Sequence, residues 1–277
     1  MKSLLWIGAG DLAQKSVSQL GTDWQTTALR RHPATQGFQH TISADITQAE
    51  SLRAIHDSYT HMVYSPTPAQ RDAQSYEAIY QQGLENLLQQ IDLSALTRFV
   101  FISSTAVYGA DPVPQDEYSM LRPPSFNGEY LLNAEQWLQR ELGDKLCIVR
   151  FSGLYGPGRH RIFERLRQQQ LRINPAMDNY ANRIHSEDAA RVCTHLLTLE
   201  APLPCYVATD STPLPARRLY AHITQQLQVP APTLDPTIPY ESKHFSNQRL
   251  LSSGFLFHYP NTLEGYTALL ASLSPDS

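Results

Sequence analysis

A glycine-rich turn near the amino terminus is the first segment whose residue types and spacing could do chemistry. Residues 8–13 read GAGDLA, the pattern GxGxxA, and follow the apolar run Leu4–Ile7. Glycines in such a turn let the backbone approach a pyrophosphate, which then lies at the amino end of the next helix. An ordinary glycine-rich turn is the alternative. The position between a strand and a helix predicts a dinucleotide site with four contact residues: Gly8, Gly10, Asp11 and Leu12.

Two arginines end the second predicted strand. Arg30 lies about 20 residues past the glycines, where a NAD site usually has an acidic residue for the ribose hydroxyl. Arg30 and Arg31 could instead hold a 2′-phosphate by charge-assisted hydrogen bonds, which favours NADP(H) over NAD(H). A solvated surface pair is the alternative. Asp45 is a candidate acceptor for the adenine amino group or a helix cap, and Ser65 is a further candidate cofactor contact.

Hydroxyl-bearing residues follow the most apolar strand of the chain. Residues 98–103 read RFVFIS and continue into Ser104 and Thr105, with Tyr108 and Gly109 shortly after. In open α/β sheets, ligands bind in a crevice at the carboxyl ends of central parallel strands. The pattern therefore predicts that Ser104 lies in a ligand-binding crevice.

Two later segments complete a pattern that resembles a known superfamily. Residues 150–159 read RFSGLYGPGR, similar to an RxxxxYGPGR segment, and residues 182–190 read NRIHSEDAA, similar to an HVDD-A segment. Together with the earlier motifs, and in the same order, they resemble the extended short-chain dehydrogenase/reductases of the NAD-dependent epimerase/dehydratase type. The resemblance covers residues 2 to about 260 and is specific as a set rather than motif by motif.

The resemblance implies roles for particular positions. Ser104 lies four residues before Tyr108, as the family's catalytic Ser or Thr lies before its YG, and would hydrogen-bond to a substrate carbonyl or hydroxyl. The family's general acid/base is the Tyr of a YxxxK pair, whose Lys lowers the Tyr pKa and holds the nicotinamide ribose. Hydride then moves to or from the nicotinamide.

The few lysines of the chain exclude that pair. None of the four has a Tyr four residues before it: Lys2, Lys15, Lys145 and Lys243. Alignment on Ala134 and Glu135 places the motif's Tyr at Asn127 and its Lys at Leu131. The chain therefore resembles the atypical subgroup of the superfamily, which keeps the nucleotide fold without the Tyr–Lys pair.

Tyr130 is a candidate substitute for the missing base. It lies three residues after Asn127 and so projects from a similar helix face. Without a nearby cation, its phenol would be a poor base at neutral pH. Tyr130 is therefore either a catalytic contact or a packing residue of the core.

Further polar residues follow the sixth predicted strand. Tyr155 and Arg159 could contact nicotinamide or substrate, or could belong to a plain turn. His185 and Asp188 could line the cleft, or could be a structural pair at a helix start. A basic stretch is interpreted as a solvated face, with a phosphate site as the alternative: Arg159, Arg161, Arg165, Arg167 and Arg172.

Alternating strands and helices must position these residues. Apolar runs predict strands, and stripes of apolar residues at helical spacing predict helices after the glycine turn, near 52–56, and over 76–91 and 128–142. This rhythm predicts an α/β fold, a Rossmann-type doubly wound parallel sheet with helices on both faces and a small C-terminal substrate lobe. The predicted strands are Leu4–Ile7, Thr26–Leu29, His40–Ile42, His61–Tyr64, Arg98–Ser103 and Leu146–Phe151.

The alternation loosens in the second half of the chain. We expect residues 1–151 to form the dinucleotide-binding domain and residues 152–277 mainly a substrate-binding lobe. Residues from about 186 to 208 are expected to return to the Rossmann sheet, with Cys205–Ala208 as a strand. Ala216–Leu227 is predicted to be a helix of the lobe.

Composition narrows the class of protein. The 277 residues carry a formal net charge of −4, which disfavours a non-specific nucleic-acid binder. Three distant cysteines favour neither a disulfide scaffold nor a zinc site, but reduced thiols in a cytoplasmic protein. No apolar run approaches the roughly 18 residues of a membrane span, and the scattered histidines predict no metal site.

Two functional hypotheses follow. The first is an NADP(H)-dependent oxidoreductase or epimerase, with NAD as the alternative cofactor, that acts on a small carbonyl or sugar-like substrate polarised by Ser104. The second is a non-catalytic NADP(H)-binding redox sensor or binding module, which the missing Tyr–Lys pair motivates. The helices near 76–91 and 128–142 often pair across a homodimer in such folds.

Overall fold

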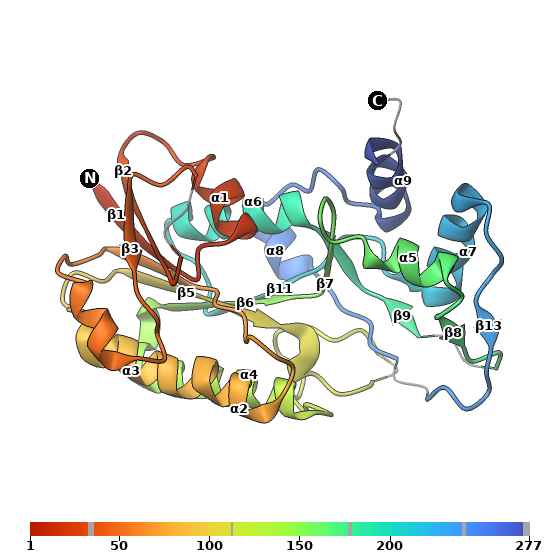
Figure 1. Ribbon diagram of the computed structural model, residues 1–277, viewed down its shortest axis with the longest axis horizontal. Coiled ribbons are helices and arrows are strands. Elements are labelled where there is room, and N and C mark those ends of the chain that lie inside the picture. Colours follow the sequence, from red (N-terminus) through yellow and green to blue (C-terminus); the bar gives the residue numbers. More distant parts are fainter. Residues whose placement is uncertain (33–35, 112, 177–178, 240–241, 274–277) are drawn as a thin grey trace. The chain divides into compact units, whose positions relative to one another are not determined.

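A seven-stranded parallel sheet forms the centre of the fold (Figure 1), in the order β3-β2-β1-β4-β5-β6-β11. Strand order reverses between β1 and β4, the kind of switch point at which doubly wound sheets bind nucleotides. The predicted Rossmann-type fold is confirmed. The strands are β1 (Lys2–Ile7), β2 (Trp24–Arg30), β3 (His40–Ser43), β4 (His61–Tyr64), β5 (Arg98–Ser104), β6 (Leu146–Phe151) and β11 (Cys205–Ala208).

The computed structural model describes residues 1–32, 36–111, 113–176, 179–239 and 242–273. The chain forms two compact units, and each is assembled from three separate stretches. The first unit contains most of the sheet: Met1–Tyr108, Leu121–Arg150 and Ala190–Tyr206. The second unit contains Gly109–Met120, Phe151–Ala189 and Val207–Ser277.

Helices cover both faces of the sheet (Figure 1), and its central strands are accordingly rich in apolar residues. Every residue of β4 and β6 is buried. On one face lie α1 (Asp11–Val17) and α6 (Ser186–Thr198), which Ser16 and Thr194 join: the Thr194 hydroxyl donates to the Ser16 carbonyl at 3.0 Å. On the other lie α2 (Ala73–Glu77), α3 (Gly83–Gln90) and α4 (Phe126–Leu142).

The structure interrupts the long helix that the sequence predicts over 76–91. A π-helical segment, η2 (Ala78–Gln82), separates α2 from α3. The buried Tyr64 hydroxyl of β4 donates to the Ile79 carbonyl at 2.5 Å, which ties the π-helical turn to the sheet. The predicted helix near 52–56 is a short 3₁₀ helix, η1 (Ala49–Ala54). Two other short 3₁₀ helices are η3 (Thr105–Val107) and η4 (Gly143–Lys145).

The second unit is built from short strand pairs and helices. The predicted helix Ala216–Leu227 is present as α7. The strand pairs are β7 (Gly153–Tyr155) with β10 (Arg183–His185), β9 (Tyr180–Ala181) with β12 (Leu214–Pro215), and β8 (Arg172–Ile173) with β13 (Thr233–Leu234). The other helices are α5 (Arg161–Arg167), α8 (Gln248–Ser252) and α9 (Thr262–Ser272). The apolar core of the unit packs around Tyr155, Phe163, Leu219 and Tyr266, which come from β7, α5, α7 and α9.

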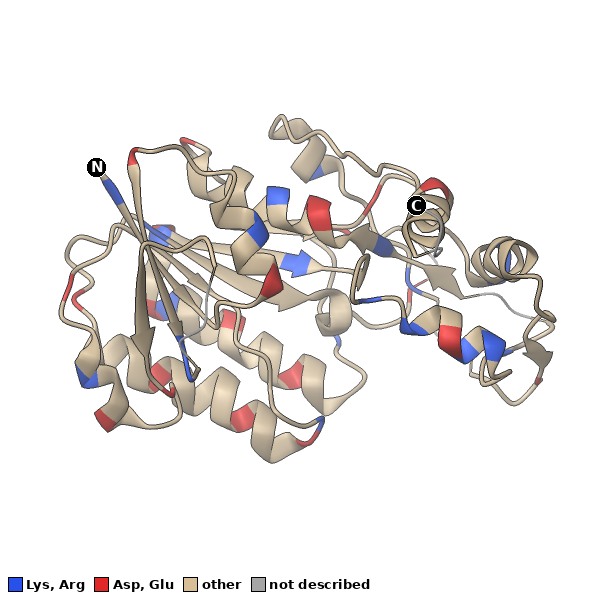
Figure 2. Ribbon diagram, turned by 45° about the horizontal axis from the view of Figure 1, so that its top comes forward, with Lys and Arg blue, Asp and Glu red and all other residues tan. Residues whose placement is uncertain are grey.

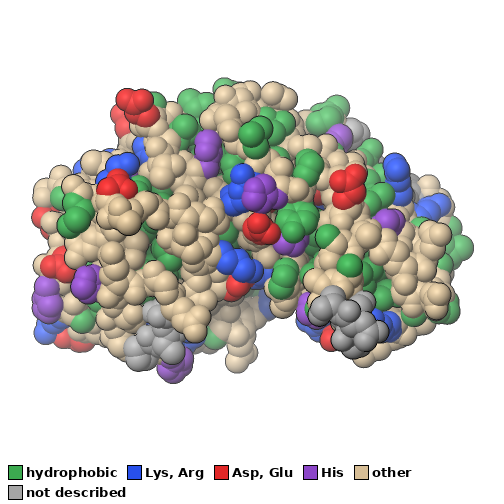
Figure 3. Space-filling model, turned by 90° about the horizontal axis from the view of Figure 1, so that it is seen from above, with side chains coloured by type: hydrophobic (Ala, Val, Ile, Leu, Met, Phe, Trp, Pro, Cys, Tyr) green, Lys and Arg blue, Asp and Glu red, His purple; other side chains and the backbone are tan. Residues whose placement is uncertain are grey.

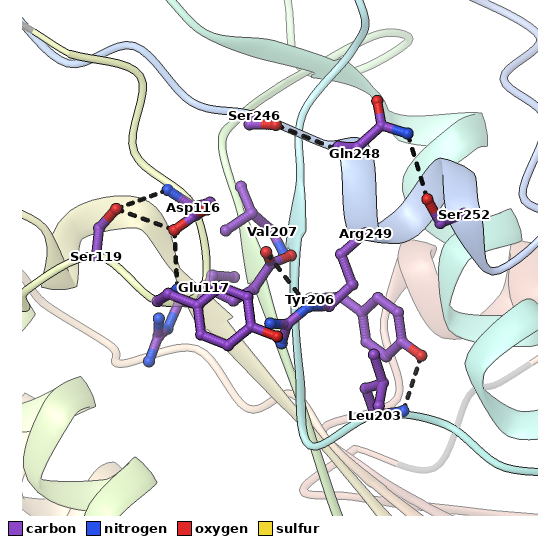
Figure 4. A network of polar contacts seen from close by, with 12 residues as sticks. Asp116, Glu117, Ser119, Leu203, Tyr206, Val207, Ser246, Gln248, Arg249 and Ser252 are labelled. Carbon is purple, nitrogen blue, oxygen red and sulfur yellow. Dashed lines mark hydrogen bonds and ion pairs between the residues drawn. The ribbon is translucent and has the colours of Figure 1, made fainter.

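A buried carboxylate, Glu117, contacts β11, one of the two edge strands of the sheet (Figure 4). It accepts the backbone N–H of Val207 in β11 at 2.7 Å. Arg249 of α8 lies 3.5 Å from the Glu117 carboxylate and against the ring of Tyr118. An edge strand has backbone groups without a partner strand, and this contact gives the Val207 N–H a hydrogen-bond acceptor.

The surface carries charges of both signs. On the face in Figure 3, acidic, basic and histidine side chains are interspersed among hydrophobic and other residues. In the described ranges, no helix is long and apolar enough to cross a membrane. Within the same residues, no group of three or more His, Cys, Asp or Glu side chains converges as a metal site.

Candidate nucleotide and substrate sites

Three predicted site residues emerge side by side at the carboxyl ends of β1, β2 and β4. Ile7 pairs with Leu29 on one side and with Tyr64 on the other, so that Gly8, Arg30 and Ser65 follow at one edge. Gly8 has φ +78° and lies so close to the next loop that a Cβ would be 2.5 Å from the Pro66 nitrogen. Only glycine fits this position, as the sequence pattern requires.

A cavity of about 300 Å³ opens at this edge in the first unit. A Cβ added to Gly10 would lie 4.0 Å from the Gly8 carbonyl oxygen, an ordinary contact, so Gly10 is not crowded by the described residues around it. Loops after β1, β2, β3 and β4 form the walls, with Ser75, Ala78 and Ile79 from the α2–η2 segment. The main lining residues are Gly8, Ala9, Gly10, Leu29, Arg30, Arg31, His32, Ala44, Asp45, Ile46, Thr47, Pro66 and Thr67.

The lining groups fit an adenine dinucleotide. The glycine loop offers the close backbone approach that a pyrophosphate needs, and Arg30 and Arg31 offer cations beside it. Asp45 also lines the cavity, and its Oδ1 accepts the backbone N–H of Thr47 at 3.0 Å and the Thr47 hydroxyl at 2.8 Å. These bonds fix the carboxylate in a turn at the cavity wall.

Other predicted cofactor contacts lie around the cavity rather than among its described lining residues. Asp11 forms an ion pair with Lys15 at 3.0 Å on the exposed side of α1. Leu12 lies beside it on the same helix and is half-buried. The Ser65 hydroxyl accepts the indole N–H of the buried Trp6 at 2.7 Å, which ties the end of β4 to β1.

Ser104 ends β5 and opens the short helix η3. Its hydroxyl oxygen accepts the backbone N–H of Ala106 at 3.1 Å, and the side chain is half-buried. Its neighbour Ser103 is buried and donates to Glu135 of α4 at 2.5 Å. Ser104 therefore keeps a hydroxyl proton that it can donate to a ligand.

A buried ion pair fixes α4 against the sheet beside this strand. Arg150 of β6 binds the Glu135 carboxylate at 2.6 Å and donates to the Tyr108 hydroxyl at 2.7 Å. On the same helix, Leu131 is 5% exposed, and Asn127 accepts the Ser125 hydroxyl at 2.7 Å. At the two aligned positions, α4 therefore carries a neutral amide and a buried alkyl group.

Tyr130 lines a different cavity, of about 240 Å³, which is formed by residues of η2, α3 and α4. Tyr80 and Trp137 line that cavity with it, together with Glu85 and Arg140. The cavity of about 300 Å³ at the ends of β1, β2 and β4 is the candidate nucleotide cavity, and its described lining residues do not include any that line the Tyr130 cavity. The geometry therefore favours a packing or surface role for Tyr130.

Tyr155 is packed into the core of the second unit. Its ring stacks on that of Tyr266, with 4.2 Å between the ring centroids, and lies edge-on to that of His185, with 5.2 Å between the centroids. Burial raises the pKa of the Tyr155 hydroxyl, and the charge of Asp210 raises this pKa further. Within the described part of the chain, this buried hydroxyl has no hydrogen-bond partner. Such a phenol cannot serve as a base at neutral pH.

The second unit contains a larger cavity, of about 590 Å³, with four arginines in its wall. Arginines recur along α5 (Figure 2), and Arg183 comes from β10. None of the described lining residues is acidic, so the cavity is suited to an anion. We name it the arginine cavity; it is lined by Gly153, Leu154, Arg159, Arg161, Ile162, Arg165, Leu171, Arg183, Tyr220 and Tyr266.

Two buried carboxylates hold the C-terminal segment of the second unit. Asp188 accepts the backbone N–H groups of His258 and Tyr259, each at 2.8 Å. Asp210, which follows β11, accepts the Thr262 hydroxyl at the start of α9. Burial raises the pKa of Asp210 to about 7. Asp188 and its neighbour His185 thus have packing contacts that account for both residues.

Comparisons with known proteins agree with this architecture. A model of the NAD dependent epimerase/dehydratase family matches residues 11–204. The chain belongs to the NAD-dependent epimerase/dehydratase family. This assignment confirms the resemblance drawn from the motifs.

Individual members show how far the similarity extends. A structure from Methylobacillus flagellatus assigned to the NAD-dependent epimerases/dehydratases has 32% identity and a TM-score of 0.82, over 98% of each chain. Protein YeeZ of Escherichia coli K12 is 27% identical over 224 residues, 79% of this chain and 78% of YeeZ. UDP-glucose 4-epimerase of Thermus thermophilus, solved with NAD, has 18% identity and a TM-score of 0.77, over 97% and 98% of the chains, and so shares the fold.

Several candidate site residues of this epimerase/dehydratase-family protein could not be identified from the sequence. Arg183, Tyr220 and Tyr266 line the arginine cavity but lie far from α5 in the sequence. The basic stretch 159–172 is a signal that could have found the cavity, although only three of its five arginines line it. Arg172 instead pairs with Asp235 at 3.1 Å. Asp210 carries no local signal at all.

Proposed function

We propose that this protein is an NADP(H)-dependent oxidoreductase or epimerase that acts on a small carbonyl or sugar-like substrate bearing an anionic group. The observation that carries the proposal is the nucleotide cavity, with its glycine loop and its two arginines at the end of β2. Ser104 lies at the end of a central strand of the same sheet. The arginine cavity of the second unit supports the proposal that the substrate bears an anionic group.

The preference for NADP(H) rests on charge. A 2′-phosphate adds negative charge next to the ribose, and the β2 end offers guanidinium groups there instead of a carboxylate. Asp45, the acidic residue in the lining, follows β3 and is held by Thr47. We expect its carboxylate to accept a hydrogen bond from the adenine amino group.

The substrate class rests on the arginine cavity. Diphosphate esters present several oxygens, and one guanidinium group can donate two parallel hydrogen bonds to such oxygens. The Thermus thermophilus neighbour is named for UDP-glucose, a sugar with such a diphosphate. We infer a nucleotide-linked sugar or a similar phosphorylated carbonyl compound as substrate.

The chain's own residues supply binding and polarisation. When bound, NADP(H) supplies or accepts the hydride. Ser104 donates a hydrogen bond to the substrate oxygen on which charge develops. Neither Asn127 nor Leu131 can exchange a proton, and Tyr130 lines another cavity, so we assign proton transfer to water.

Calorimetric titration with NADP⁺ and NAD⁺ tests the cofactor. Replacing Arg30 and Arg31 with Ala should weaken NADP⁺ binding by at least about tenfold, because charge-assisted contacts to the phosphate are lost, and should leave NAD⁺ binding nearly unchanged. Arg53→Ala, at an exposed arginine paired with Glu50, is the matched control. Equal losses for both cofactors would refute the 2′-phosphate argument.

A panel of carbonyl and nucleotide-sugar substrates tests turnover through the nicotinamide absorbance. Ser104→Ala should lower kcat about 100-fold, with partial rescue by Ser104→Thr, while the exposed Ser94→Ala should not change it. Saturable NADP(H) binding without turnover on any compound would favour the second candidate. That candidate, a non-catalytic NADP(H)-binding sensor or module, is supported by the neutral pair at 127 and 131.

We also propose a cytoplasmic location, because the three cysteines form no disulfide with one another and so fit a reducing compartment.

We further propose a homodimer that covers the surface around the cavity formed by η2, α3 and α4. Tyr130 and Trp137 line that cavity, and both side chains are half-buried. Trp137→Glu should halve the apparent mass in sedimentation equilibrium. An unchanged mass would refute this interface.

A further inference from the structure

Asp210 connects two walls of the arginine cavity, although it does not line the cavity itself. Its backbone N–H donates to the Arg183 carbonyl at 2.7 Å, and its carboxylate accepts the Thr262 hydroxyl. Arg183 lies on β10, and Thr262 begins α9, the helix that carries Tyr266. A change at Asp210 therefore reaches both walls through direct hydrogen bonds.

The surroundings of Asp210 keep its ionisation finely balanced. The residue is 1% exposed, and burial raises its pKa to about 7. Hydrogen bonds from Thr262 and Thr212 and the charge of Arg183 lower this pKa, whereas the nearby Asp188 raises it. The phenols of Tyr155 and Tyr266 also interact electrostatically with Asp210.

Arg183 is the charge that Asp210 and a cavity ligand would share. Its side chain lines the cavity, and its positive charge favours the ionised form of Asp210. An anion bound against Arg183 offsets that positive charge and adds negative charge near the carboxylate. Both effects disfavour ionisation of Asp210, since like charges oppose each other in a buried site.

We propose that an anion entering the arginine cavity is taken up together with a proton at Asp210. The proton comes from solvent, binds the Asp210 carboxylate, and returns to solvent when the anion leaves. The inference rests on the proposed function only in requiring that the cavity accept an anionic substrate.

The direction of the pH effect follows from reciprocity. Because the anion favours protonated Asp210, protonated Asp210 must favour the anion by the same factor. Affinity is therefore highest below pH 7 and falls as the pH rises through neutrality. The coupling acts on substrate binding in the second unit and does not involve the nucleotide cavity.

Isothermal titration with UDP-glucose measures this coupling, because its diphosphate stays fully ionised between pH 6 and 8. Titrations at pH 7 in buffers of different ionisation enthalpy give the number of protons taken up. We expect a fractional uptake by the wild-type protein and at least about fivefold tighter binding at pH 6 than at pH 8. Asp210→Asn should abolish both effects. Asp235→Asn, at a half-buried carboxylate of the same unit that pairs with Arg172, should preserve both.

The outcomes separate this inference from the proposed function. Binding without proton uptake, or uptake that persists in Asp210→Asn, overturns the linkage and leaves the anion site intact. No binding of UDP-glucose at any pH overturns the anion cavity and the linkage together. If Asp210→Asn does not fold, the wild-type buffer series still decides, because zero uptake at pH 7 refutes the linkage.

Discussion

At the scale of single residues, Gly265 leaves no room for a side chain beside Tyr155. A Cβ at Gly265 would lie 1.8 Å from the Tyr155 hydroxyl and 2.8 Å from its ring. Gly265→Ala should therefore lower the free energy of unfolding by about 2 kcal/mol, measured by denaturant titration. Adding Tyr155→Phe should restore part of the loss, since the nearest clashing atom is gone; no recovery would contradict this packing.

The same tyrosine carries a buried hydroxyl without a partner among the described residues. Leaving such a group unpaired costs about 1–3 kcal/mol. Tyr155→Phe alone should therefore keep or raise the unfolding free energy, by about 1 kcal/mol, without disturbing the stack on Tyr266. A clear loss of stability in thermal unfolding would show that the hydroxyl has a partner, such as a bound ligand.

Residues with strong local patterns could be predicted, and residues that depend on distant partners could not. The positions of Gly8 and Arg30 follow from their spacing along the strand–helix–strand unit of β1, α1 and β2. Arg183 meets α5 only through the fold of the second unit, and Asp210 acquires its character from burial beside Asp188. Neither burial nor a contact between residues far apart in the chain can be inferred from the sequence next to these residues.

At the scale of elements, Arg98 of β5 caps the carboxyl end of α6. Its guanidinium donates to the Leu196 and Leu197 carbonyls at 2.9 and 3.1 Å, and also to those of Leu199 and Glu200. Last-turn carbonyls have no partners within a helix. Arg98→Lys, which cannot span this set, should cost about 2 kcal/mol of unfolding free energy. Arg53→Lys at an exposed pair should cost almost nothing, and equal effects would contradict the capping role.

Strands were easier to predict than the fine structure of helices. His61–Tyr64, Leu146–Phe151 and Cys205–Ala208 match the predicted bounds because buried parallel strands are short apolar runs between turn residues. The apolar stripe over 76–91 indicates which face is buried but not the π-helical turn within it. That turn depends on Tyr64, which reaches the Ile79 carbonyl from another element.

At the scale of the whole molecule, the two units should respond to acid in opposite directions. In the first unit, burial and the charges of Arg98 and Lys2 lower the pKa of His61 to about 4. Its stabilising contribution is present above about pH 6.5 and is lost as the pH falls towards 4. In the second unit, the raised pKa of Asp210 gives a contribution that is present below about pH 4 and is lost as the pH rises through 7.

Hydrogen exchange, corrected for intrinsic rates, can measure both units in one sample. As the pH is lowered from 7 to 4.5, protection of the backbone amides against exchange should decrease in β1 and β4. Over the same change, it should increase in β10 and α9. His61→Gln should remove the first trend, and Asp210→Asn should remove the second. Parallel changes in both units would refute independent titration of these two groups.

The interleaving of the two units along the chain has a consequence for synthesis on the ribosome. The first unit needs residues 190–206, which contain most of α6 and the start of the edge strand β11. The second unit needs residues 109–120, which emerge long before the rest of that unit. Neither unit can therefore complete its fold from one continuous stretch of the growing chain. The nascent polypeptide must keep an open sheet edge until β11 arrives, so chaperone contact should be greatest while residues 151–208 are being translated.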